Sequence, residues 1–240
     1  MNLKKKLVVI TVFAIAMGLL ETAVVIYLRE LYYPGGFDFP LNPIPGSTAL
    51  TEILREAATL IMLISIGIIA GKTFSQGFAW FLYSFAVWDI FFYLFLKILI
   101  DWPSSFLTWD ILFLIPTTWT GPVIAPVLVS LTMIVLALVI LLNAEKGNNT
   151  RISRIEWWLL VAGSLVLIFG FIFDYSRYMM EHVSLGEMFQ MNNTEVMKTA
   201  FSYIPVQFPW WIFILGEGII ISGIIRLGFR IRKGTGQGRV

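Results

Sequence analysis

The sequence contains no cysteine and only one histidine. Without cysteine, the chain lacks disulfides, Cys-ligated zinc, iron–sulfur clusters and thiol catalysis. The single His182 excludes a His-rich metal site and a bis-His haem within one chain. We therefore expect no metal site and no cofactor.

Charged residues are also scarce. Only 13% of the 240 residues are charged and 58% are hydrophobic, whereas a soluble domain has roughly 25% charged residues. The mean hydropathy of +0.83 leaves too little polar surface for a soluble enzyme, and it excludes disorder, which needs low hydrophobicity. A net charge of +2, with basic residues at segment ends, argues against a nucleic-acid partner. The composition indicates an integral membrane protein whose surroundings are the lipid bilayer.

Six hydrophobic stretches are long enough to cross a bilayer, which takes about 20 residues in a helix. They cover residues 7–28, 53–70, 78–100, 122–142, 157–178 and 208–225. The stretches lack the alternation of strands, and a spanning helix satisfies its own backbone. The sequence thus predicts an all-α membrane protein: one domain, 1–240, built as a bundle of six transmembrane helices. The first stretch resembles a signal peptide, but its apolar run continues well past Ala14-Ile15-Ala16, so we expect it to be retained.

The orientation follows from the 17 basic residues, of which twelve lie at one set of helix ends and five at the other. Cytoplasmic loops carry the excess of Lys and Arg. We therefore expect a prokaryotic cytoplasmic membrane with both termini in the cytoplasm.

Two segments on the predicted outer side contain further short elements. Residues 104–116 are largely apolar, but their hydrophobic part, 106–115, would span only about 15 Å as a helix. Prolines bound the segment, so we predict a short helix between the third and fourth spans, either re-entrant or interfacial. Farther along, Val196, Ala200 and Tyr203 are spaced as one face of a short amphipathic helix.

Acidic residues are placed unevenly, because only Glu145 and Glu156 of fifteen fall on the cytoplasmic side. A charge at the centre of a spanning helix costs roughly 2.5–3.5 kcal/mol, so such groups face the interior, pair or become neutral. We predict Glu21, Asp89 and Glu217 as the core acids of an outward-facing polar cavity. The other candidate residues of this ligand-binding cluster lie at similar depth: Arg55, Glu56, Tyr93, Lys97, Asp110, Asp174 and Arg177.

Local spacing suggests some contacts of this cluster. Asp174 and Arg177 are three residues apart and could pair directly. The third span is rich in aromatic residues beside Asp89, which form either a packing surface or a wall for a cation or flat ligand. The motif Gly67–Gly71 suits close helix packing better than phosphate binding, because no strand precedes it.

Three classes of function remain open. The first is a transporter-like protein or one that binds a small ligand or ion in the cavity. The second is an intramembrane enzyme acting on a lipid or other apolar substrate, with one acid as general acid or base. The third is a structural subunit of a larger complex, in which the charges form interhelical ion pairs. No motif assigns a catalytic residue, and homo- or hetero-oligomers are compatible with all three.

Overall fold

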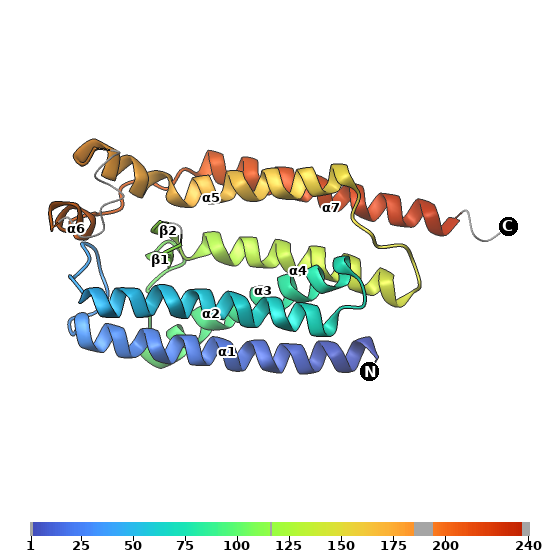
Figure 1. Cartoon of the computed structure of the whole chain (residues 1–240), viewed down its shortest axis with the longest axis horizontal. Coiled ribbons are helices and arrows are strands. Elements are labelled where there is room, and N and C mark those ends of the chain that lie inside the picture. The colour runs from blue at the N-terminus through green and yellow to red at the C-terminus, as the bar shows by residue number, and fades with distance from the viewer. Residues whose placement is uncertain (1, 116, 185–193, 237–240) are drawn as a thin grey trace.

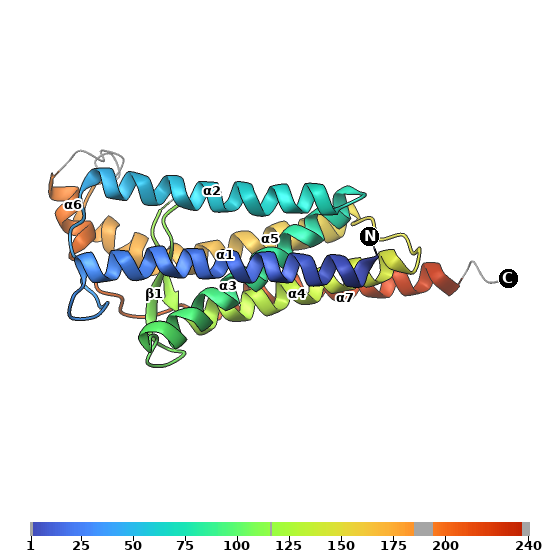
Figure 2. The same ribbon diagram turned by 90° about the horizontal axis from the view of Figure 1, so that it is seen from below.

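A computed structural model describes residues 2–115, 117–184 and 194–236 of the chain as a bundle of long helices lying side by side (Figures 1 and 2). Six helices are long and apolar enough to cross a membrane. They are α1 (Leu3–Tyr32), α2 (Gly46–Ala70), α3 (Phe74–Ile100), α4 (Ile124–Glu145), α5 (Arg154–His182) and α7 (Trp210–Gly236). The predicted all-α, six-helix membrane fold is confirmed.

Helices α1 and α5 begin before their hydrophobic stretches because their polar N-terminal ends are capped. The Asn2 side chain accepts a hydrogen bond from the Lys5 amide at 3.0 Å, so the basic start of α1 is helical. At α5, Ser153 and Glu156 form a reciprocal capping box. Hydropathy locates the apolar part of these two helices, and the capping residues set where they begin.

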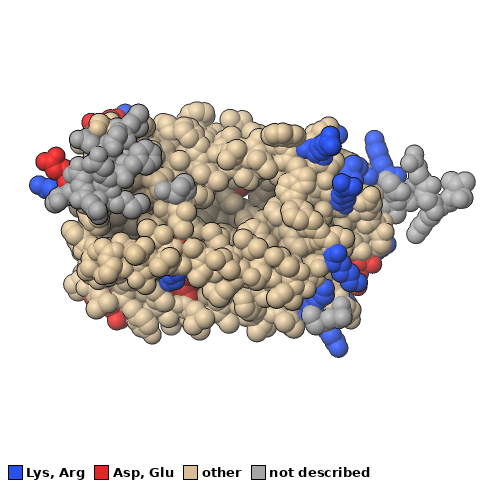
Figure 3. Space-filling model, in the orientation of Figure 1, with Lys and Arg blue, Asp and Glu red and all other residues tan. Residues whose placement is uncertain are grey.

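Both termini lie at the same end of the bundle (Figure 1). Lys and Arg side chains gather at that end in the space-filling view, and few lie at the other (Figure 3). We call it the basic end. This distribution is the one on which the predicted orientation rests.

Helix α3 packs against α1, α2 and α4, while α5 packs chiefly against α7. Glycines bring two of these pairs into close approach. A Cβ on Gly67 of α2 would lie 2.6 Å from the Gly77 carbonyl oxygen of α3. A Cβ on Gly163 of α5 would lie 2.9 Å from the Gly216 carbonyl oxygen of α7. The close-packing interpretation of Gly67 is thus confirmed.

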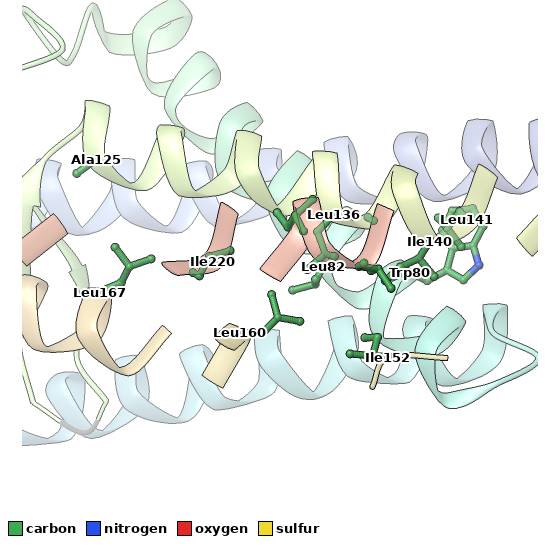
Figure 4. Close-up of a cluster of buried hydrophobic side chains, with 14 of the residues drawn as sticks. Trp80, Leu82, Ala125, Leu136, Ile140, Leu141, Ile152, Leu160, Leu167 and Ile220 are labelled. Atoms are coloured by element: carbon green, nitrogen blue, oxygen red, sulfur yellow. The ribbon is translucent and has the colours of Figure 1, made fainter. Parts of the chain in front are cut away.

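A cluster of buried hydrophobic side chains joins the helices along the middle of the bundle (Figure 4). It includes Trp80 and Leu82 from α3, Leu136 from α4, and Leu160 from α5. Ile220 of α7 lies in the same cluster. The cluster continues along the bundle as far as Phe171 of α5, which also borders the candidate site.

The segment between α3 and α4 corrects one prediction, since it forms a hairpin where we expected a short helix. Strands β1 (Trp109–Phe113) and β2 (Trp119–Pro122) pair antiparallel. A ten-residue apolar run does not distinguish a strand from a helix, and here part of the run pairs as a strand with Trp119–Pro122. The sequence of β1 does not alternate between apolar and polar residues. Asp110 is its one polar residue, and that side chain is buried.

The second short element is as expected. Helix α6 (Thr194–Phe201) lies between α5 and α7 in the chain, near the end of the bundle opposite the termini (Figure 1). Val196 is buried, and Tyr203 just after the helix is fully buried against Tyr175 of α5. The apolar spacing therefore marks a face that docks on the bundle.

Candidate functional site

A cavity of about 340 Å³ lies between the hairpin and helices α1 to α5. Its charged and phenolic lining comes from five of the residues that the sequence singles out: Glu21, Arg55, Glu56, Asp89 and Tyr93. Aromatic residues from α3, α5 and both strands complete the wall. The face of the molecule drawn in the space-filling view is hollowed near its middle, just below α5 in that orientation (Figure 3).

Arg55 is the one basic residue among those lining the cavity, and two carboxylates bind it. Its guanidinium forms an ion pair with Glu21 across the α1–α2 interface. It also bonds Glu52, one turn earlier on α2, with a nitrogen–oxygen distance of 2.8 Å. The positive charge of Arg55 is thus matched by acids of α1 and α2.

Glu56, one residue further along α2, has a different kind of partner. Its two carboxylate oxygens accept the backbone N–H of Leu114 at distances of 3.2 and 3.0 Å. Leu114 directly follows β1 and has no strand partner in the pairing of the hairpin. Glu56 therefore anchors the hairpin to α2 as well as lining the cavity.

Asp89 of α3 accepts a hydrogen bond from the Ser130 hydroxyl of α4 at 2.8 Å. No ion pair joins it to a basic group among the residues that the structure describes. Phe85, Trp88 and Phe92 of the same helix line the cavity together with Asp89. Asp89 is thus a carboxylate held by one neutral donor in an aromatic setting.

Tyr93 connects the cavity to a buried ion pair behind it. Its hydroxyl donates to Asp110 of the hairpin at 3.2 Å. Asp110 pairs with Arg29 of α1 at 3.3 Å, and both side chains are almost fully buried. The Arg29 guanidinium also lies over the rings of Trp102 and Phe37, at 3.8 and 4.5 Å from their centroids.

Arg29 is a residue that sequence reasoning used only for orientation. Its signal was a basic side chain about two helical turns after Glu21, at a depth where a charge needs a partner. The partner lies 81 residues away in the chain, and spacing along one helix could not identify it. Asp110 was predicted as part of the ligand-binding cluster; it is buried and pairs with Arg29, and it does not line the cavity.

Five predicted site residues do not line the cavity: Asp110, which lies behind it, and Lys97, Asp174, Arg177 and Glu217. Lys97 pairs with the exposed Asp101 at 2.6 Å. Its hydrogen bond and charge hold the pKa of the Asp101 carboxyl below its usual range. These two residues belong to the surface near the end of α3.

The predicted Asp174–Arg177 pair is replaced by other contacts. Arg177 pairs with Glu181 on the exposed face of α5, at 2.9 Å. Asp174 accepts instead from the Tyr203 hydroxyl at 2.7 Å and from the Val206 amide at 3.1 Å. Burial raises the pKa of Tyr203 well above its usual range, so the phenol stays protonated and donates a hydrogen bond to Asp174. Asp174 thus fixes the segment that follows α6.

Glu217 of α7 accepts a hydrogen bond from the Thr132 hydroxyl of α4 at 2.8 Å. Its other oxygen, Oε1, is buried without a hydrogen-bond partner among the described residues. Of the two flanking glycines, Gly216 lies against Leu167 of α5, and Gly218 has no atom within 4 Å of an added Cβ. Glu217 therefore occupies a separate position between α4 and α7.

The residues that the structure describes contain no group of three or more His, Asp or Glu side chains arranged to hold a metal ion. No family model matches the chain, and neither does any curated protein or solved structure among those compared.

Proposed function

We propose that the protein binds a small organic cation in the cavity between the hairpin and α1 to α5, as a transporter or a ligand-binding membrane protein does. The observation that carries the proposal is that this cavity holds two acids, Glu56 and Asp89, that form no ion pair among the described residues and lie within an aromatic wall. The remaining acid, Glu21, is matched by Arg55.

The charge balance supports a cationic ligand. Arg55 forms its ion pairs with Glu21 and Glu52, so neither Glu56 nor Asp89 has an ion-pair partner among the described residues. Ionised groups at membrane depth are costly unless they are paired or neutralised. A bound cation would supply the missing charge next to Asp89, and a proton would do so in its absence.

The aromatic wall supports an organic cation over a bare metal ion. Rings of Phe81, Phe85 and Trp88 line one side, and Trp119 and Phe171 line another. Ring faces attract ammonium groups, and the contribution grows when the cation is desolvated. Hard metal ions instead need several oxygen ligands. The volume of about 340 Å³ falls in the range of small-molecule sites.

The packing beyond the cavity supports access from the end opposite the termini. Buried Leu82, Leu136 and Leu160 fill the bundle toward the basic end (Figure 4). A ligand in this conformation would reach the cavity from the other half of the molecule or through its hollowed side. If the basic end is cytoplasmic, this conformation is an outward-facing one.

The experiment compares a cation with its neutral isostere. The purified protein in nanodiscs is titrated with choline, tetramethylammonium or tetraethylammonium, and choline is compared with 3,3-dimethylbutan-1-ol, in which carbon replaces the charged nitrogen. We expect at least one cation to raise the melting temperature, since a ligand at 100 times its Kd adds about 2.7 kcal/mol of stability. The neutral isostere should have little effect.

Two variants supply a matched comparison. Asp89→Asn removes a carboxylate that lines the cavity, and Glu217→Gln removes a carboxylate on α7 that does not. Each acid accepts one hydroxyl from α4 at 2.8 Å. We expect Asp89→Asn to weaken cation binding by about tenfold or more and Glu217→Gln to leave it unchanged. Equal binding of choline and its isostere, or no response to any of the cations, would overturn the proposal.

A further inference from the structure

A second pocket, of about 520 Å³, lies near the basic end of the molecule. The loop before α5 and the first turn of α5 form one side of the pocket. The first residues of α3 and Arg230 of α7 form the other sides. Its lining consists of Phe74, Ser75, Asn149, Arg151, Ile152, Ser153, Arg154, Trp157 and Arg230. It is separate from the cation cavity and shares no residue with it.

Three arginines line this pocket and no acidic residue does. The nearby Glu156 is fully buried and is bound by Arg230, with oxygen–nitrogen distances of 2.8 and 2.9 Å. The side chains of Arg151 and Arg154 are exposed, and neither pairs with an acid among the described residues. The pocket therefore carries an excess of positive charge.

Hydrogen bonds hold the loop before α5 in place and tie it to Arg230 of α7. Arg230 donates to the Arg151 carbonyl oxygen at 2.5 Å, which ties α7 to the loop. Its bonds to Arg151 and Glu156 use Nε and Nη2, so Nη1 remains for a ligand. Asn149 accepts the Arg151 amide at 3.1 Å, and Ser75 accepts the Ile152 amide at 3.3 Å. The backbone of the loop is thus fixed before any ligand binds.

An aromatic surface borders the charged part of the pocket. The Trp157 ring lies 5.8 Å from that of Phe74 and 5.0 Å from that of Phe78, measured between centroids. Phe74 is 77% exposed. Tryptophan and other aromatic residues are favoured at the boundary between headgroups and acyl chains. A charged pocket next to this surface lies where lipid phosphates are found.

We propose that this pocket binds a phosphate group, with Arg151, Arg154 and Arg230 as its ligands. Guanidinium groups bind phosphate oxygens through paired, charge-assisted hydrogen bonds. Two sources share this chemistry: the headgroup of an anionic phospholipid and a free phosphate. Basic pockets between helices at a membrane surface recognise anionic headgroups. The site does not depend on the function proposed for the cation cavity.

The experiment has one arm for each source. In the first arm, the protein is reconstituted in nanodiscs of phosphatidylcholine alone or with phosphatidylglycerol, and melting temperature and bound lipid by native mass spectrometry are measured. In the second arm, inorganic phosphate is titrated into the protein in a neutral detergent, with sulfate-free chloride buffer of equal ionic strength as reference. Stabilisation in the first arm alone identifies a headgroup, and stabilisation in the second shows that phosphate suffices.

Matched variants separate a specific site from general attraction to anions. The double variant Arg151→Gln/Arg154→Gln removes two exposed side chains that would bind phosphate. Arg230 is kept because it forms an ion pair with the buried Glu156. Arg226→Gln/Arg232→Gln removes two exposed arginines near the same end of α7, outside the pocket. We expect the first variant to weaken phosphate or lipid binding about tenfold or more and the second to leave it nearly unchanged. No binding in either arm, or equal losses in the two variants, would overturn the proposal.

Discussion

The carboxylate of Glu56 holds the backbone amide of Leu114, which joins α2 to the residue that follows β1. A hairpin between two spanning helices needs such an anchor, because its unpaired N–H groups are costly away from water. The contact positions the hairpin, which forms one wall of the cavity, so the geometry of the cavity depends on it.

We expect Glu56→Ala to lower stability by about 1–3 kcal/mol, because the Leu114 amide would lose its acceptor. Glu56→Gln keeps an acceptor oxygen in the same place and should cost less. Melting of both variants in one detergent measures the difference. Equal losses would show that the charge matters and the hydrogen bond does not.

The buried pair Arg29–Asp110 gives a second prediction. Arg29→Met leaves the Asp110 carboxylate without its cation and should cost roughly 3–5 kcal/mol. The double variant Arg29→Met/Asp110→Asn removes both charges and keeps an acceptor for the Tyr93 hydroxyl. We expect it to be more stable than Arg29→Met alone. A double-mutant cycle of melting measurements gives the coupling, and a loss equal to the sum of the single losses contradicts the pairing.

Close packing of α2 on α3 predicts the effect of a single methyl group. A Cβ on Gly67 would lie 2.6 Å from a backbone oxygen, which cannot move as a side chain can. We expect Gly67→Ala to destabilise the protein by about 1–3 kcal/mol. The control is Gly218→Ala, whose Cβ meets nothing within 4 Å. Because alanine favours a helix by up to about 1 kcal/mol over glycine, the control should be neutral or stabilising.

The orientation of the chain can be tested directly, because the absence of cysteine removes background labelling. A cysteine introduced at Lys4 or Lys233, both at the basic end, should react with an impermeant maleimide only after the cells are opened. A cysteine at Asp38, between α1 and α2, should react in intact cells. Reaction of Lys233→Cys in intact cells would reverse the orientation on which the outward-facing description rests.

The spanning helices could be predicted because hydrophobic length alone determines them. Depth along each helix could also be counted, and this placed Glu21 and Asp89 at levels where they line one cavity. The short helix before Tyr203 followed from its apolar spacing. These features depend on one segment at a time, which is what a single sequence describes.

The partner of each acid could not be predicted, because it depends on how each helix is rotated toward its neighbours. Asp174 and Arg177 are suitably spaced, yet Arg177 points to the exposed face and pairs with Glu181. Arg29 finds Asp110 only because the hairpin folds back between the helices. The hairpin itself was missed because a ten-residue apolar run fits a helix or a strand equally well.

Ser130 and Thr132 lie two positions apart on α4 and hold acids on opposite sides, Asp89 of α3 and Glu217 of α7. Two residues along a helix are separated by about 200° around its axis. A turn of α4 about that axis would therefore break both hydrogen bonds together. A rearrangement that opens the cavity by turning α4 would release Asp89 and Glu217 at the same moment, whereas one that moves α3, α4 and α7 as a rigid unit would keep both hydrogen bonds.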